Sequence, residues 1–202
     1  MSSRAKSGVN RAKVRVIEVR DSLAKNVALE VELEVREGRV CPDPGRDILL
    51  FTVVERHGRN GNVGAAFAKG FGLRKGAIAS SLSIPSNNLV AVGTNEDDIW
   101  RALSRVNEIQ GGLVVVVDGK IVAEVAIPFG GIMSELPADQ LIERIWKTEE
   151  VVRELGCTFK NPFFTMALTV LSTVPELGLS DRGLVDALRN RIVPVLVEEA
   201  SP

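Results

Sequence analysis

The segment from Val27 to Val35 constrains the fold of this chain more than any other, because its apolar residues recur at every second position. Glu30, Glu32 and Glu34 occupy alternate positions between them. A period of two places successive side chains on opposite faces of a strand and cannot form one apolar stripe along a helix. The segment therefore predicts a half-exposed strand with acidic side chains on its outer face.

Further strands are expected on both sides of this one. Residues 13–19 alternate basic and apolar side chains, whereas residues 48–54 and 89–92 are almost continuously apolar, as buried strands are. Asp118-Gly119 separates two runs rich in β-branched residues, 113–117 and 121–127. This dipeptide favours a type I′ turn, which requires positive φ at both central residues, and so predicts a β-hairpin.

The first helix is expected after residue 94. Thr94 begins a sequence that resembles a capping box, and Ile99, Leu103 and Val106 follow at helical spacing. Gly111-Gly112 would then end the helix. Trp100 lies within this segment and is expected to pack in the interior, as is Trp146 in a second helix.

The second half of the chain predicts more helix. A helix is expected from about Pro137 to Leu155, with one apolar face and Gly156 beyond its end. Residues 162–171 are apolar without a clear period, and residues 184–197 are expected to form one more helix, interrupted or ended near Pro194. Because no repeat or linker divides the chain, residues 13–202 predict a single α+β domain with mixed, largely antiparallel sheet layers flanked by helices.

Composition narrows the class of protein. The 202 residues have a formal net charge of −1, which gives no basic surface for nucleic acid. No apolar run approaches the roughly 18 residues that span a membrane, so we expect no membrane partner and a cytoplasmic protein. Residues 1–12 predict a disordered basic tail. The absence of Tyr and the abundance of Val, Ile and Arg are typical of a thermophile.

The two cysteines and the long apolar runs add two expectations. Cys41 and Cys157 lie far apart without metal-ligand spacing, and we interpret them as packed, reduced thiols. Residues 121–131 and 162–171 contain few charges that would solvate an uncovered face. Because large exposed apolar patches are rare on soluble monomers, these runs favour a homo-oligomer, most simply a twofold dimer.

The densest group of polar residues is Glu55-Arg56-His57, at the end of the expected strand 48–54. If the strand continues to His57, Glu55 and His57 share a face, and the carboxylate can orient the imidazole for proton transfer. The alternative is a strand end whose polar side chains meet solvent or cap a loop. Both interpretations stay open at this point.

A glycine-rich loop follows. Its backbone amides and Arg59 would suit an anion, yet the loop 58–64 lacks the Gly-Lys-Ser/Thr ending of a P-loop and does not fit G-x-G-x-x-G. Glycines required for turns are the alternative. Ser80 and Ser81 have no base with a recognisable relation to them, so a nucleophilic serine is not supported.

The segment 52–81, TVVERHGRNGNVGAAFAKGFGLRKGAIASS, resembles the C-terminal domain of adenine deaminase. The resemblance continues, in the same order, through NLVAVGTNEDD, GGLVVVVDGKIVAEV, GGIMSELPAD, RELGC, NPFFTM and PELGLSDRGLVD, and covers residues 13–187.

The resemblance implies that the family's deamination chemistry resides in an N-terminal amidohydrolase barrel whose histidines and aspartate bind metal. This chain contains one histidine, so one copy cannot supply a multi-histidine metal centre. We therefore expect no metal and no other cofactor here.

A second departure lies in residues 80–88. Where family members tend to read SSVAHDSHN, Ile84 and Pro85 replace His-Asp and Asn87 replaces the second His, while Ser86 and Asn88 match. Ile-Pro-Ser-Asn cannot bind metal or shuttle protons as His-Asp-Ser-His can. For this chain a turn is the better interpretation.

These observations predict an accessory or oligomerising module that is not catalytic alone. Its expected partners are further copies of itself and a separately encoded amidohydrolase barrel. The alternative is an adenine deaminase-related hydrolase or purine-binding protein with a cleft around Glu55, Arg56 and His57. The candidate site residues are then Glu55 and His57 for catalysis, and for ligand binding Arg56, Arg59, Ser86 and Asn88.

Overall fold

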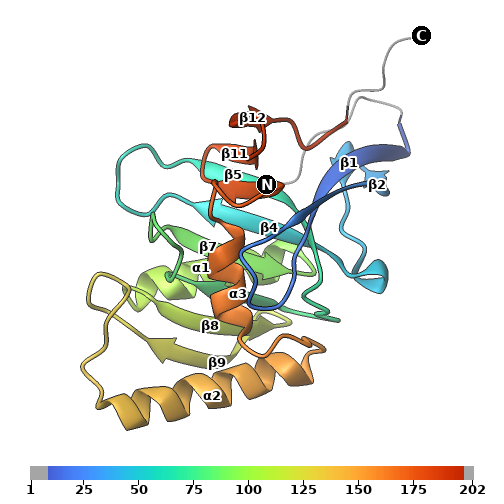
Figure 1. Ribbon diagram of the computed structural model, residues 1–202. Coiled ribbons are helices and arrows are strands. Elements are labelled where there is room, and N and C mark those ends of the chain that lie inside the picture. Colours follow the sequence, from blue (N-terminus) through green and yellow to red (C-terminus); the bar gives the residue numbers. More distant parts are fainter. Residues whose placement is uncertain (1–8, 198–202) are drawn as a thin grey trace.

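The computed structural model describes residues 9–197, which fold around one large mixed β-sheet (Figure 1). The strands in these residues are β1 (Arg11–Glu18), β2 (Val27–Arg36), β3 (Arg39–Val40), β4 (Ile48–Val54), β5 (Val63–Lys69), β6 (Ala77–Ser80), β7 (Leu89–Gly93), β8 (Gly112–Val117), β9 (Lys120–Ala126), β10 (Leu177–Ser180), β11 (Gly183–Asp186) and β12 (Arg191–Val193). The helices are α1 (Glu96–Glu108), α2 (Ala138–Glu154) and α3 (Pro162–Thr169), with a short 3-10 turn at Pro44–Arg46.

Nine of the described strands form the large sheet, in the order β3-β2-β1-β5-β4-β7-β6-β8-β9, and three form a small sheet, β10-β11-β12. Within residues 9–197, β1 and β5 pair in parallel and the other neighbours pair in antiparallel. The expected α+β class, with a mixed and largely antiparallel sheet, is confirmed.

The large sheet is buried on both faces at its centre. Leu49, Phe51 and Val53 of β4 join a cluster with residues of α2, α3 and the small sheet. Ile48 and Leu50 point the other way and join a cluster with the apolar residues of α1. This two-sided burial explains why the sequence of β4 is continuously apolar, and it confirms the prediction of a buried strand at residues 48–54.

The strands predicted from alternation and turn chemistry are also present. In β2 the valines and leucines are half-buried or buried, and the glutamates between them are exposed. Asp118 and Gly119 have φ of 50° and 75° and join β8 to β9, which confirms the predicted hairpin. The strand at β1 begins at Arg11, within the expected tail; residues 1–8 of that tail lie outside the described part of the chain.

Two details of the predicted helices are wrong. The N-cap of α1 is Asn95, whose side chain accepts the amide of Asp98, while Thr94 donates its hydroxyl to the carbonyl of Gly76. Both tryptophans lie on outer helix faces: the exposed fraction is 62% for Trp100 and 63% for Trp146. Other side chains occupy the interior sides: those of α1 are mainly aliphatic, and those of α2 are Thr148, Glu149 and Val152.

The predicted helix at residues 184–197 is also wrong. Leu184 and Val185 belong to β11, and a turn with Asn190 at positive φ leads into β12. The two short apolar segments on either side of this turn are therefore strands and not one helix. The last helix is instead α3, within the apolar run that showed no clear period.

The small sheet packs closely against β5. A Cβ added to Gly64 of β5 would lie 1.9 Å from the carbonyl oxygen of Ser180 in β10.

Cys41 and Cys157 both carry free thiols. Burial raises the pKa of the Cys157 thiol to about 11, which keeps it protonated and unreactive at neutral pH. None of the helices in residues 9–197 has the length and apolar character needed to cross a membrane.

Candidate functional site

The carboxylate of Glu55 organises the loop that follows β4. The strand ends at Val54, and Glu55 turns inward until 9% of its surface remains exposed. Its Oε1 accepts the amide of His57 at 2.6 Å. Its Oε2 accepts the amides of Arg59, Asn60 and Gly61 at 3.0, 3.2 and 3.2 Å.

This arrangement decides the charge of Glu55. Burial alone would raise the pKa of the carboxyl, but the four amide donors outweigh it and the net pKa lies below its ordinary value. The sequence suggested that the loop amides could bind an external anion. In the structure the amides of residues 57, 59, 60 and 61 already donate to the carboxylate of Glu55. Glu55 therefore contacts the backbone of His57 and not the imidazole, so the expected carboxylate–imidazole pair is not formed.

His57 instead contacts the turn at residues 83–88. Its Nε2 lies 2.8 Å from the carbonyl oxygen of Ser86. The hydroxyl of Ser86 accepts the amide of Asn88, whose side chain is 4% exposed. The Oδ1 atom of Asn88 has no hydrogen-bond partner among the described residues.

Arg56 reaches across to the segment that follows β9. Its guanidinium donates to the carbonyl of Gly130. A Cβ added to Gly131 would lie only 2.4 Å from a guanidinium nitrogen of Arg56. The hydroxyl of Ser81 donates to the carbonyl of Gly131 at 2.7 Å and accepts the amide of Gly112 at 2.9 Å. Gly131 has φ of 76°, so both space and backbone conformation favour glycine there.

These contacts border a hollow of about 360 Å³. It is lined by Arg56, His57, Asn107, Gln110 and Pro128. Of the candidate residues, Arg56 and His57 thus lie together, with Ser86 beside the imidazole. Arg59 and Asn88 do not line the hollow, and Glu55 supports it from within the loop.

Sequence reasoning missed Asn107, Gln110 and Pro128 as neighbours of the Glu-Arg-His cluster. Asn107 belongs to the last turn of α1, and Gln110 follows that helix. Pro128 follows β9. The strand order that brings them to the end of β4 depends on contacts between distant segments, and no local pattern reports it.

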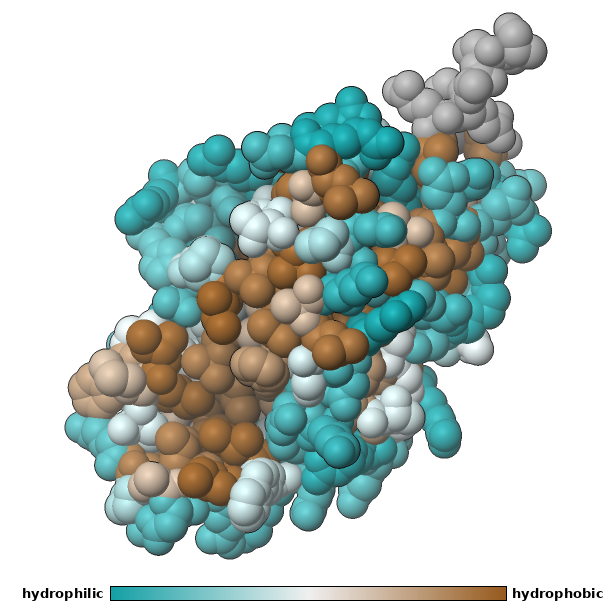
Figure 2. All heavy atoms as spheres, in the orientation of Figure 1, coloured by the Kyte–Doolittle hydropathy of each residue, from teal (hydrophilic) through white to brown (hydrophobic). Residues whose placement is uncertain are grey.

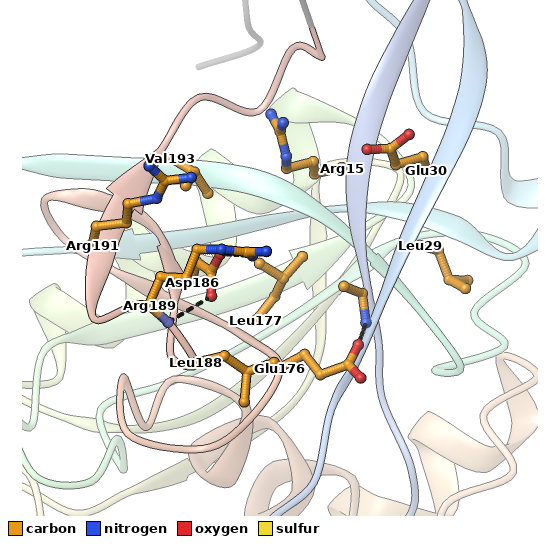
Figure 3. A pocket seen from close by; sticks show the side chains of 11 residues that line it. Arg15, Leu29, Glu30, Glu176, Leu177, Asp186, Leu188, Arg189, Arg191 and Val193 are labelled. Atoms are coloured by element: carbon orange, nitrogen blue, oxygen red, sulfur yellow. Dashed lines mark hydrogen bonds and ion pairs between the residues drawn. The ribbon is translucent and has the colours of Figure 1, made fainter.

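A second hollow, of about 370 Å³, opens between β1, β2 and the small sheet (Figure 3). Within residues 9–197, all of its charged side chains except Arg191 have a partner. Asp186 pairs with Arg189 and Glu30 with Lys13. Glu176 accepts the amide of Ala28, and Arg15 donates to the carbonyls of Pro194 and Leu196. We therefore interpret this region as a structural contact in which polar side chains hold the small sheet against β1 and β2.

An apolar surface begins beside the first hollow, since Phe129 follows Pro128 in the chain. We use the term apolar face for Phe129, Ile132, Met133, Ile142 and Trp146, whose exposed fractions range from 44% to 63%. The first three lie in the segment between β9 and α2, and the others lie one helical turn apart on α2. Figure 2 shows apolar side chains gathered beside this segment and over the region of β8, β9 and α3 in Figure 1, down to the upper edge of α2, whose lower side is largely hydrophilic.

Metal binding requires several ligand side chains close together. Among residues 9–197, no three His, Cys, Asp or Glu side chains come together in a group able to hold a metal ion. The single histidine contacts a backbone carbonyl, as described above.

The role of Glu55 predicts a specific effect of the change Glu55→Gln. One acceptor oxygen would become an amide donor facing backbone N–H groups, so the amides of residues 57, 59, 60 and 61 should exchange with solvent about tenfold faster or more. Because the folded pKa is lowered, the contribution of Glu55 is fully present above its unfolded pKa of about 4.3 and is lost as the pH falls through the folded pKa. Hydrogen exchange by NMR and thermal unfolding against pH measure both effects.

The wild type and Glu55→Gln should therefore differ most in Tm near pH 7 and converge in strong acid. Glu37→Gln, at an exposed turn, is the matched control and should change neither quantity. Equal exchange rates in Glu55→Gln and the wild type would contradict the assigned role.

Comparison with known proteins identifies the family. Residues 25–191 match the model of the family described as the adenine deaminase C-terminal domain. The chain is 43% identical over 189 residues to the adenine deaminase of Desulforamulus reducens, with 94% of this chain and 32% of that protein covered. It is 40% identical over 185 residues to the adenine deaminases of Clostridium botulinum and Brucella melitensis, with 92% of this chain covered and 31% and 32% of those proteins.

The chain thus spans about a third of the length of these curated relatives. The identity extends through both sheets, since it covers more than nine-tenths of the chain. The chain belongs to the family of the adenine deaminase C-terminal domain.

Proposed function

We propose that this chain is an accessory module of purine metabolism that does not deaminate adenine alone and that associates with other chains through the apolar face. The observation that carries the proposal is the exposure of Phe129, Ile132, Met133, Ile142 and Trp146 on a domain that corresponds to one third of its relatives. Large apolar patches on soluble domains are ordinarily covered by a partner. The partner we favour is a second copy, related by a twofold axis.

A separately encoded amidohydrolase barrel is the other partner that the family membership supports. The relatives carry about two thirds of their length outside the region matched here. In this proposal such a barrel would cover the surface that contacts the rest of the protein in those relatives. We propose the cytoplasm as its compartment, since both cysteines carry free thiols.

A second candidate function is binding of adenine or another purine, or a hydrolytic reaction on it, in the hollow beside Arg56 and His57. The observation that favours it is the lining: the carboxamides of Asn107 and Gln110 each offer a donor and an acceptor, as the edge of a purine base does. Glu55 would act there by holding the loop. Of the other ligand candidates, Ser86 positions the imidazole, while Arg59 and Asn88 lie outside the lining.

The first prediction concerns activity. The purified chain should release no ammonia from adenine above background, with or without added manganese, iron or zinc, because one histidine cannot hold a metal-bound hydroxide in the manner of a multi-histidine centre. Ammonia release measured with a coupled assay decides this. Metal-dependent turnover that co-purifies with the chain through several columns would overturn the proposal.

The second prediction concerns self-association. Light scattering at micromolar concentration should give twice the chain mass of 21.8 kDa. Trp146→Ser should weaken the dimer by about 2 kcal/mol, roughly thirtyfold in Kd, because buried tryptophans contribute strongly to interfaces. Trp100→Ser removes an equally exposed tryptophan from α1 and should leave the mass unchanged. A wild-type mass near 21.8 kDa would sink the homodimer and leave the separate barrel as the partner.

A further inference from the structure

The guanidinium of Arg56 carries a charge that no carboxylate of the described residues neutralises. It donates to the carbonyl of Gly130, and no ion pair or second hydrogen bond engages it within residues 9–197. An arginine has five N–H donors, so most of its donor capacity is unused. Partial burial lowers the pKa of Arg56, as expected for a cation without a counter-ion.

The surroundings of this cation contain donors but no acid. The hollow that Arg56 lines is bordered by the imidazole of His57 and by the carboxamides of Asn107 and Gln110. Glu55, the adjacent residue, is held by four loop amides. The other acid near this end of α1, Glu108, pairs with Arg101 and Arg105.

The C-terminus of α1 also borders the hollow, and its carbonyls would repel an anion. Three of these carbonyls are occupied: the amides of Ile109, Gln110 and Gly111 donate to the carbonyls of residues 105, 107 and 106. Their partial charge is thereby reduced at the surface of the hollow. The full charge of the Arg56 guanidinium therefore dominates this site.

We propose that the hollow beside Arg56 binds a small oxyanion, the phosphate or carboxylate group of a metabolite. Two oxygens of such a group match the fork of N–H donors on the guanidinium, and charge-assisted bonds of this kind are stronger than neutral ones. The amide groups of Asn107 and Gln110 supply further donors from the lining. At about 360 Å³ the hollow is at the small end of the range for metabolite sites. This inference goes beyond the accessory function and does not depend on self-association.

The test is titration with inorganic phosphate and with acetate, followed by backbone amide shifts. The amides of residues 56–57, 107–110 and 129–131 should shift together in a saturable way, with a Kd on the order of 1 mM. Arg56→Gln should weaken the binding at least about tenfold. Arg191→Gln removes the same charge from the rim of the other hollow and should change the Kd less than about twofold. The anion that binds more tightly identifies the group as phosphate or carboxylate.

Asn107→Asp keeps the claim testable if Arg56→Gln fails to fold. It places a carboxylate in the lining without touching the contact between Arg56 and Gly130, and repulsion should weaken either anion about tenfold. Absence of saturable shifts with both anions at roughly 10 mM would overturn the proposal. Equal weakening by Arg56→Gln and Arg191→Gln would overturn it too, because binding would then follow net charge. Saturable binding of adenine without binding of either anion would also count against it, in favour of the purine candidate.

Discussion

The burial of β4 on both faces is the constraint on which the rest of the structure depends. Alternate residues of this strand enter the two apolar clusters of the sheet, so its position is fixed from both sides. Glu55 follows the last residue of this strand and binds four amides of the next loop. The rigid core therefore extends, through one carboxylate, into the loop that carries Arg56 and His57. Both side chains of the candidate site depend on that extension.

The strands β1, β2, β4, β7, β8 and β9 were predictable because their patterns are local, whereas β3, β5 and β6 were not predicted. The alternation of β2, the continuous apolar run of β4 and the Asp118-Gly119 turn each report their environment within about ten residues. The C-terminal region was not predictable in this way, because β10, β11 and β12 are short and contain few apolar residues each. The exposure of Trp100 and Trp146 also depends on which helix face meets the sheet. That face of α1 is mainly aliphatic, whereas the buried residues of α2 are Thr148, Glu149 and Val152.

The candidate site was predictable only in part, for a related physical reason. The Glu-Arg-His cluster is visible in the sequence, but its geometry was inferred from a strand that would continue to His57. The strand ends at Val54, and the carboxylate of Glu55 folds back on the loop amides. The other lining residues, Asn107, Gln110 and Pro128, come from distant parts of the sequence and are brought to the site by the tertiary fold. The segment after β9 carries both the carbonyl that holds Arg56 and three residues of the apolar face, so the hollow and the apolar face share one structural element.

The central claim is that another copy of the chain covers the apolar face, and the two tryptophans allow a direct measurement. In the variant Trp100→Phe, all tryptophan fluorescence comes from Trp146 on α2. If a second copy covers Trp146, its emission should move to shorter wavelength as the protein concentration rises through the Kd, because the indole leaves water. The variant Trp146→Phe reports Trp100 on α1 and should show no such shift. Emission from Trp146 that is independent of concentration, in a chain that light scattering finds monomeric throughout, would contradict the account.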